Sequence, residues 1–399
     1  MYTMGGGNVE EQYYGAAAKV QKRYYTDQFS LHQSRLNEIS VEAKEGKKSN
    51  DITRRDNDGC CDQDFDKKWS RREKSDLYMT TLNFKVIEKL GKGGFGVVYL
   101  ARWYHNKRLL NLPPNGDLCA LKVANKQQLI KKKAQTFVIR ERDLLHCCNH
   151  PNLTKLLTSF KDEVNIYMVL EFIAGGDFFM YIRARDRIAE DHARFYVQQV
   201  ILGFEYLHCC NILYRDLKPE NIMLTGRGYI KLIDFGFAKQ VLTKTATMCG
   251  TPQFMSPEII LQENYDRCID WWALGILNYE MMAGESPFHG DSDEELFEAI
   301  LKNPIRFKST IFSNVAADFI KGLLTRNPKR RLGCTHEGMD AVKYHPWFKR
   351  GYSFEQILQQ NKTAVYVPST LKDYRNVPLK LIEVTKAQQL TNEDEFVDF

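Results

Sequence analysis

YRDLKPENIML, residues 214–224, is the segment that decides how this sequence is interpreted. Its Asp216 can accept a proton from an attacking hydroxyl group and orient that group. Lys218 can neutralise charge on a phosphoryl group in transit. Asn221 offers an amide oxygen and Asp234, in IDFGFA, offers a carboxylate, and both suit a hard cation such as Mg²⁺. The segment therefore predicts metal-dependent phosphoryl transfer, and a set of turn residues without chemistry is the alternative.

A glycine-rich segment, LGKGGFGVVYL, lies upstream and places Gly91, Gly93 and Gly96 in a GxGxxG array. Glycines let backbone amides approach phosphate oxygens without a Cβ in the way. Dinucleotide-binding folds use the same spacing before a helix. Here the residues that follow, Val97 to Tyr99, favour a strand instead. We therefore expect a phosphate-covering loop between two strands.

Lys122, in CALKV, lies on a predicted strand that would pack beneath this loop. An ordinary exposed lysine is the alternative. Glu141 lies in the next predicted helix and can pair with a poorly solvated ammonium group. A lysine held by a glutamate is well placed to bind phosphates as a point charge, so the two residues support the phosphoryl-transfer prediction.

The hydrophobic pattern predicts an α+β fold with two lobes. FKVIEKL, VVYLARW and CALKVA are rich in β-branched and aromatic residues, which is typical of strands. TFVIRERDLLHCC and AEDHARFYVQQVILGFEYLH carry apolar residues at helical spacing. After Gly175-Gly176 the pattern is mostly helical. A small β-rich lobe with one main helix should thus precede a larger, mainly helical lobe.

Composition limits the partners that the chain can have. With 399 residues, 43% hydrophobic, it can bury a sizeable core. The net charge of +6 comes without an arginine stripe interleaved with aromatics, so we expect no nucleic-acid partner. The sequence has no apolar run long enough to predict a membrane span, and its first residues, MYTMGGGNVEEQYY, do not resemble a signal peptide. The ten cysteines are expected to be reduced thiols in a cytoplasmic protein, with nuclear entry left open.

Together these residues resemble the protein kinase signature, and the resemblance covers about residues 64–350. It implies ATP as substrate, Mg²⁺ as cofactor, Asp216 as catalytic base and Asn221 with Asp234 as metal ligands. It also implies an ATP-binding set and a Glu258–Arg331 bridge, and that Asp270 braces the catalytic loop. The ATP-binding set is Leu90, Gly91, Gly93, Gly96, Val98, Lys122, Glu141, and the hinge residues Glu171 and Ile173.

YRD, MCGTPQFMSPE, DWWALG and RRLG resemble the AGC family of serine/threonine kinases. DFDKKW at residues 64–69 and the terminal FVDF are similar to the catalytic subunit of the cyclic-AMP-dependent kinase. The resemblance implies a polar, flexible arm (1–63), a docking helix and linker (64–83), the kinase domain (84–348) and an AGC tail ending in FxxF (349–399). The domain would divide into lobes 84–173 and 174–348. A protein kinase C-like or cyclic-GMP-dependent-like kinase, and a pseudokinase scaffold, are the alternatives.

The same resemblance implies substrates and regulation. Asp177, Glu220 and Glu280 match positions that receive basic side chains upstream of the phosphorylated residue, and carboxylates bind arginine bidentately. Thr247 matches the activation-loop phosphorylation site of the family, and Thr245 is the alternative. An upstream kinase or the chain itself would phosphorylate it. A phosphate there could pair with Arg215 and Lys239.

A separate cyclic-nucleotide-binding regulatory subunit is the implied partner. Ala246 stands where the cyclic-AMP-dependent kinase has a tryptophan that contacts regulatory subunits, and Glu285 and His289 replace aromatics that hold its peptide inhibitor. Regulatory-partner binding therefore has less support in the sequence than catalysis.

Overall fold

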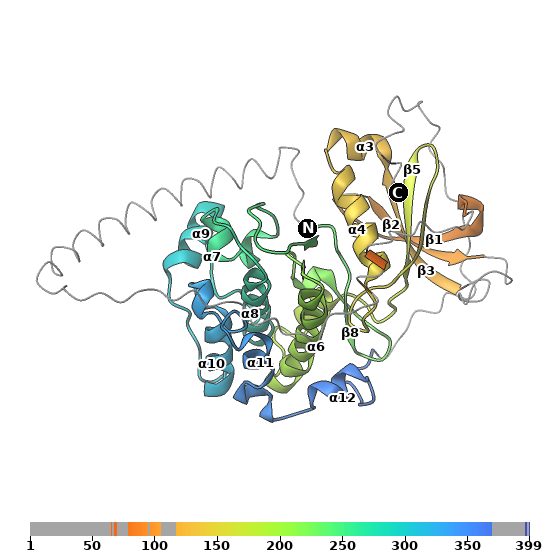
Figure 1. Cartoon of the computed structure of the whole chain (residues 1–399). Helices are drawn as coiled ribbons and strands as arrows, with labels where there is room; N and C mark the ends of the chain where they lie inside the picture. Colours follow the sequence, from red (N-terminus) through yellow and green to blue (C-terminus); the bar gives the residue numbers. More distant parts are fainter. Residues whose placement is uncertain are drawn as a thin grey trace, which may run out of the picture.

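The computed structural model describes residues 65, 68–69, 79–94, 96–104, 117–368, 396 and 399. The proposed arm, residues 1–63, lies outside them. A β-rich lobe, orange to yellow in Figure 1, sits beside a larger helical lobe drawn in green to blue. The predicted bilobal α+β fold is therefore confirmed.

The small lobe is built on one antiparallel sheet with strand order β1-β2-β3-β5-β4. Its strands are β1 (Phe84–Lys92), β2 (Val97–Trp103), β3 (Asp117–Asn125), β4 (Leu156–Lys161) and β5 (Asn165–Glu171). One face buries stacked aromatics, in which the Phe160 ring centroid lies 4.5 Å from that of Tyr167 and 5.4 Å from that of Phe84. Stacked rings add specific contacts to their apolar burial, which makes this face rigid.

Two helices follow β3. They are α3 (Lys126–Lys131) and α4 (Gln135–Cys147). Helix α3 begins where the Asn125 side chain accepts a hydrogen bond from the Gln128 amide, a common N-cap arrangement. Helix α4 buries Val138, Leu144 and Leu145 in the main core, and Glu141 lies among its buried residues. A buried carboxylate requires a charged or hydrogen-bonding partner. The partner of Glu141 therefore fixes the position of α4.

The large lobe packs its helices around α8, whose residues are nearly all buried. Its helices are α5 (Phe178–Arg183), α6 (Glu190–Cys209), α7 (Pro257–Ile260), α8 (Cys268–Ala283), α9 (Asp293–Lys302), α10 (Asn314–Leu323), α11 (Gly338–Lys343) and α12 (Phe354–Leu358). Helix α8 ends at Gly284, which has a left-handed φ of 79° and is the usual way to stop a helix. Both α6 and α10 contact α8.

Short strands carry the candidate site between the lobes. They are β6 (Ile212–Leu213), β7 (Ile222–Leu224), β8 (Ile230–Leu232) and β9 (Lys239–Gln240). Strand β6 pairs with β9, and β7 pairs with β8, in two antiparallel hairpins. The YRDLKPEN loop runs from β6 to β7, and the IDFGFA segment runs from β8 to β9. Two short hairpins thus bring these two polar segments side by side.

Aromatic residues near both ends of the chain pack on the body. Phe65 is fully buried and stacks on Trp69, with ring centroids 5.7 Å apart. Phe396 is buried, its carbonyl accepts a hydrogen bond from Lys161, and its ring lies 5.9 Å from the Lys126 ammonium. The C-terminus lies beside the small lobe, whereas α12 lies at the far end of the large lobe (Figure 1).

The cysteine prediction needs a correction. Cys268 and Cys334 form a disulfide with Cα atoms 5.7 Å apart, although all cysteines were expected to be reduced. The fold brings the first residue of α8 against the loop that follows Arg331, and no local spacing announces this pair. The six other described cysteines form no disulfide. Among the described helices, none is long and apolar enough to cross a membrane.

Candidate active site

Lys122 and Glu141 join β3 to α4. The Lys122 ammonium lies 2.6 and 2.8 Å from the two carboxylate oxygens of Glu141. The glutamate side chain is 1% exposed and the lysine side chain 11%. Burial would lower the pKa of Lys122, but the charges of Glu141 and Asp234 outweigh it and raise that pKa. The ammonium therefore stays charged in a poorly solvated place.

The glycine loop connects β1 to β2, as the sequence indicated. The Gly93 amide donates to the Gly96 carbonyl over 2.9 Å, which closes the turn. A Cβ on Gly96 would lie 2.4 Å from the Val123 carbonyl oxygen, so this position requires glycine. Val98 pairs across the sheet with Gly91 on one side and Lys122 on the other. The loop thus lies over the strand that carries Lys122, while Leu90 on β1 is exposed.

The YRDLKPEN loop, residues 214–221, surrounds Asp216 with donors. The Asn221 amide nitrogen donates to the Asp216 carbonyl over 2.8 Å and to its Oδ2 over 2.7 Å. Lys218 Nζ lies 2.9 Å from Oδ2. Burial raises the pKa of Asp216, and the nearby Lys218 opposes that rise. The carboxylate is therefore fixed in one orientation with a basicity above that of an ordinary aspartate.

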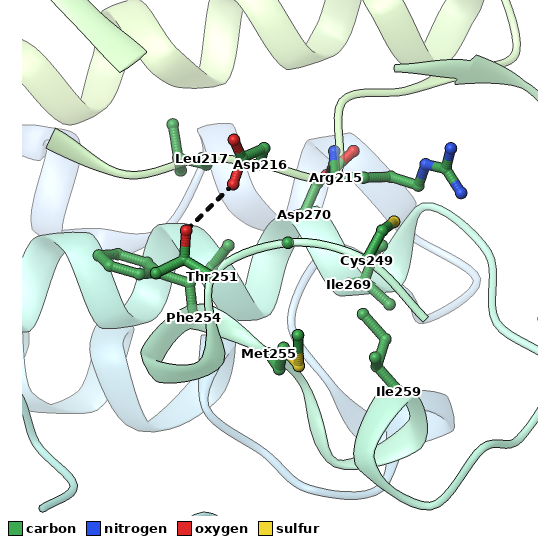
Figure 2. A pocket seen from close by; sticks show the side chains of 12 residues that line it. Arg215, Asp216, Leu217, Cys249, Thr251, Phe254, Met255, Ile259, Ile269 and Asp270 are labelled. Atoms are coloured by element: carbon green, nitrogen blue, oxygen red, sulfur yellow. Dashed lines mark hydrogen bonds between the residues drawn. The ribbon is translucent and has the colours of Figure 1, made fainter. Parts of the chain in front are cut away.

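Thr251 is a third contact to Asp216. Its hydroxyl donates to Asp216 Oδ1 over 3.3 Å and accepts from Lys218 Nζ over 2.9 Å. Figure 2 shows the Thr251 hydroxyl pointing to the Asp216 carboxylate above a pocket that Met255 and Ile259 also line. The segment that carries Thr251 is thereby tied to the YRDLKPEN loop.

Asp270, at the start of α8, holds the backbone of this loop. Its Oδ2 accepts from the Tyr214 amide over 3.0 Å and its Oδ1 from the Arg215 amide over 2.9 Å. His208 Nε2 lies 2.8 Å from Oδ2. Arg215 adopts a left-handed φ of 69°, an uncommon backbone conformation that such contacts can maintain.

Asn221 and Asp234 fit a metal ion by the chemistry of their free ends. Both hydrogen bonds of the Asn221 side chain to Asp216 come from its nitrogen, so its amide oxygen is the end available to a cation. Asp234 Oδ1 accepts from the Gly236 amide over 2.9 Å. The Asp234 charge also raises the pKa of Asp216, so the two carboxylates face a common space. Oxygen ligands of this kind suit Mg²⁺, which binds few protein groups and keeps waters and phosphates.

The hinge residues lie where β5 ends. Glu171 is the last residue of β5, and Ile173 is buried two positions later. Lys231 Nζ lies 2.6 Å from Glu171 Oε1. The backbone between Glu171 and Ile173 connects the lobes. The resemblance to protein kinases implies that adenine binds there.

The three proposed substrate carboxylates lie in different settings. Glu220 and Glu280 are close enough for the Glu220 charge to contribute to a raised pKa at Glu280, which is due first to burial. Arg183 lies 3.8 Å from Glu280. Asp177 instead caps α5, where its Oδ1 accepts from the Phe179 and Met180 amides over 2.7 and 3.2 Å. The structure therefore brings together two of the three, and it gives Asp177 a structural contact as well.

Three cations converge near the activation loop. Burial and then the Arg215 charge lower the pKa of Arg140 on α4 and also that of Lys239 on β9. Lys239 Nζ donates to Thr245 Oγ1 over 3.0 Å, and Thr245 is buried. Tyr265 donates its hydroxyl to the carbonyl of Thr247, whose side chain is partly exposed. The positive charges of Arg140, Arg215 and Lys239 repel one another, and a nearby anion would stabilise this group.

Arg331 and Glu258 form the bridge that the resemblance implied. Arg331 Nη1 and Nη2 lie 2.6 and 2.8 Å from the two oxygens of Glu258, and Nη1 also donates to the Cys268 carbonyl over 2.8 Å. The arginine side chain is 0% exposed. This bidentate pair fastens α7, at the end of the activation segment, to the core of the large lobe.

Sequence reasoning missed three contacts of the site. Thr251 lies within CGTP, where the sequence alone assigns it no role, and Arg140 directly precedes Glu141. Lys132 belongs to a run of three lysines that resembles a solvated face, yet its Nζ donates to the Gly94 carbonyl over 2.8 Å. A basic residue beside Glu141 was the one available signal for Arg140. The other two contacts depend on tertiary packing.

Comparison with known proteins places the chain in a family. Residues 84–348 match the sequence model described as "Protein kinase domain". A Caenorhabditis briggsae protein, "cAMP-dependent protein kinase, catalytic subunit-like", is 40% identical over 264 residues, which cover 66% of each chain. The "cAMP-dependent protein kinase type 3" of Saccharomyces cerevisiae is 38% identical over 286 residues, 72% of this chain and 69% of the yeast protein.

A Drosophila melanogaster "cGMP-dependent protein kinase, isozyme 1" is 38% identical over 330 residues, which cover 80% of this chain and 42% of the fly protein. The chain thus spans about two thirds of the nematode protein and less than half of the fly protein. The chain belongs to the protein kinase domain family and, within it, to the AGC serine/threonine kinases close to the catalytic subunits of cyclic-AMP-dependent protein kinases.

Proposed function

We propose that this chain transfers the γ-phosphoryl group of ATP to serine or threonine hydroxyls of proteins. The observation that carries the proposal is the set of contacts around Asp216, which Asn221, Lys218 and Thr251 hold in one orientation. The substrate oxygen would form the new bond to the γ-phosphorus while the bond to the β–γ bridging oxygen breaks, leaving ADP. Asp216 would accept the hydroxyl proton, and Lys218 would balance charge on the phosphoryl oxygens.

Mg²⁺, held by Asn221 and Asp234, would neutralise charge on the phosphates. Lys122 would bind the α- and β-phosphates, oriented by Glu141 over 2.6 Å. Peptide phosphorylation in the presence of ATP and Mg²⁺ tests the proposal. We expect transfer by the wild type and none after EDTA is added. A wild-type protein that binds ATP but transfers nothing to any peptide would favour a scaffold instead.

For substrates we propose sites with arginine upstream of the phosphorylated residue. Glu220 and Glu280 support this, because two neighbouring carboxylates raise each other's energy unless a cation lies between them. Arg183, 3.8 Å from Glu280 and with its side chain 55% exposed, would yield its place to a substrate arginine. A peptide library should show arginine selection by the wild type and loss of that selection in Glu220→Gln/Glu280→Gln. Asp177→Asn tests the third predicted carboxylate, and Glu205→Gln, at a carboxylate that pairs with Lys343, is the matched control. An unchanged library profile in the Glu220/Glu280 double variant would contradict the assignment.

We propose phosphorylation of Thr247 as the activating modification, made by an upstream kinase or by the chain itself. The cation group of Arg140, Arg215 and Lys239 supports it, because a phosphate would relieve their repulsion. Thr245 is less suited, since it is buried against Lys239. Thr247→Ala should lose activity while Thr245→Val, which also removes a hydroxyl, keeps it. Equal activity of Thr247→Ala and the wild type would remove the proposal.

We propose regulation by a separate cyclic-nucleotide-binding subunit. The named cyclic-AMP-dependent catalytic subunits among the relatives support it. Ala246, Glu285 and His289 argue for a weaker contact than in that relative. Purification of the tagged chain from cells with and without cyclic AMP tests it. A regulatory chain released by the nucleotide is expected, whereas activity that cyclic AMP leaves unchanged in lysate would contradict it.

For location we propose the cytoplasm, with entry into the nucleus left open. Six of the eight described cysteines lie outside the single Cys268–Cys334 disulfide, and a majority of cysteines without disulfides suits a reducing compartment. Fractionation of cells that express the chain tests this, and recovery in the secreted fraction would contradict it.

A further inference from the structure

Lys231, in the middle of β8, is tied to two segments that lead into the small lobe. Its Nζ donates to Glu171 Oε1 over 2.6 Å and to the Leu153 carbonyl over 3.1 Å. The lysine side chain is 15% exposed and the glutamate side chain 27%. An ion pair at this depth is less screened than one on the open surface, so it holds its partners more firmly.

Glu171 lies at the start of the proposed adenine-binding hinge. Its Oε1 also accepts from the Lys155 amide over 2.8 Å, and its own amide donates to the Lys155 carbonyl over 3.0 Å. The side chain and the backbone of one residue thus fasten the end of β5 to the segment before β4. The segment before β4 also joins β8 through backbone bonds of Asn152 and Thr154 to Leu232, and the Lys231 contact adds a side-chain link from Glu171 itself to the hairpin of the large lobe.

The hairpin that carries Lys231 also carries both proposed metal ligands. Asn221 directly precedes β7, and Asp234 follows β8 by two residues. Met223 and Lys231 are paired across the hairpin, and the Ile233 amide donates to the Asn221 carbonyl over 3.0 Å. Lys231 is therefore connected to Asn221 and Asp234 by a short, fully paired piece of backbone.

We propose that Lys231 is a positioning residue for the nucleotide: through Glu171 it fixes the adenine-binding hinge relative to the metal ligands Asn221 and Asp234. A nucleotide must reach the hinge with its base and the metal site with its phosphates at the same time. Holding both ends at the right separation before binding lowers the free-energy cost of binding. The inference rests on the nucleotide site proposed above.

Lys231→Met tests the proposal by removing the ammonium and keeping much of the apolar stem. ADP affinity, measured by calorimetry with Mg²⁺, should fall about three- to tenfold, the effect of losing one partly buried charged hydrogen bond. KM for ATP should rise by a similar factor, and kcat should stay within about twofold of the wild type, because no transition-state contact is lost. Adenosine, which reaches only the hinge, should lose less affinity than ADP. Lys231→Arg should restore most of the ADP affinity.

Lys343→Met is the matched control. Lys343 Nζ lies 2.7 Å from Glu205, and both side chains are 25% exposed, so this pair resembles the Lys231 pair but belongs to the large lobe alone. It should change stability without changing ADP affinity. Should Lys231→Met fail to fold, Glu171→Gln breaks the same pair from the other side and should weaken ADP similarly.

Three results would overturn the proposal. They are an ADP affinity of Lys231→Met equal to that of the wild type, an equal loss in Lys343→Met, or an equal loss for adenosine and ADP. If the wild type binds ADP and Lys231→Met binds it with equal affinity, only the positioning role is refuted. A wild type that binds no ADP refutes the nucleotide site as well.

Discussion

The Lys122 ammonium contacts both carboxylate oxygens of Glu141, at 2.6 and 2.8 Å, and so connects the central strand of the small-lobe sheet to its main helix. Because Asp234 also acts on this ammonium, the pair faces the segment that carries Asp234. The position of α4 and the charge at the proposed phosphate site are therefore set by one interaction.

This pair should be non-additive in catalysis. Lys122→Met is expected to lower kcat/KM by on the order of 10²-fold or more, as for other single charged contacts to a transition state. Glu141→Gln should cost less, because the lysine remains. The double variant should be no worse than Lys122→Met, since residues that act as a unit do not add. A double variant with the product of the two single losses would show that the residues act separately.

Thr251 should contribute through its hydroxyl. Thr251→Val keeps the shape and removes the contacts at 2.9 Å to Lys218 and 3.3 Å to Asp216. We expect kcat to fall about tenfold, as for one lost hydrogen bond near the reacting groups. Thr325→Val, which removes a hydroxyl bonded to the Lys321 carbonyl outside the site, is the control. Similar kcat values for both variants would remove Thr251 from the catalytic arrangement.

Arg331 should dominate the stability of the large lobe. Arg331→Ala leaves the buried Glu258 carboxylate without its bidentate partner, which should cost about 3–5 kcal/mol of unfolding free energy. Lys302→Ala disrupts a pair at 3.9 Å whose side chains are 40% and 36% exposed, and it should cost under about 1 kcal/mol. Urea unfolding of both variants provides the comparison. Equal losses would mean that burial does not govern the Arg331 bridge.

His150 should make stability depend on pH. Burial, followed by the Lys231 charge, lowers its pKa from 6.5 to about 4, and its neutral Nδ1 accepts from the Asn152 amide over 3.2 Å. Between these two pH values the unfolded chain binds a proton that the folded chain does not. The contribution of the neutral His150 to the unfolding free energy is therefore fully present above about pH 6.5 and decreases as the pH is lowered toward 4.

His150→Asn removes this contribution while keeping an acceptor for the Asn152 amide. Its unfolding free energy, relative to that of the wild type, should rise as the pH is lowered from 6.5 to 4. His336→Asn, at a side chain that is 91% exposed, is the control for a lost imidazole. Parallel pH profiles for the wild type and His150→Asn would contradict the assignment.

The sequence allows prediction of those site residues whose chemistry is written locally. Asp216, Lys218 and Asn221 lie within one short loop, and the strands flanking the glycine loop follow from β-branched residues. These features depend on neighbours along the chain, so composition and spacing are sufficient to find them. The α+β division into lobes follows from the change of hydrophobic period near Gly175.

Contacts between distant segments could not be predicted in this way. Thr251 reaches Asp216 across 35 positions, Lys231 reaches Glu171 across 60, and Cys268 is bonded to Cys334 across 66. Each pair is joined only once the lobes and loops have packed. A lysine in a charge run, such as Lys132, likewise resembles a solvated residue until the fold places the Gly94 carbonyl within 2.8 Å of it.

Phosphate transfer from ATP with Mg²⁺ to an arginine-rich serine peptide, by wild type and by Asp216→Asn, tests the central claim most directly. Both proteins should first be confirmed to carry phosphate on Thr247 and to bind ADP. The account predicts transfer by the wild type and a loss of about 10²- to 10⁴-fold in the variant, as for a removed general base. Equal transfer by the two proteins, or none by the phosphorylated wild type, would contradict it.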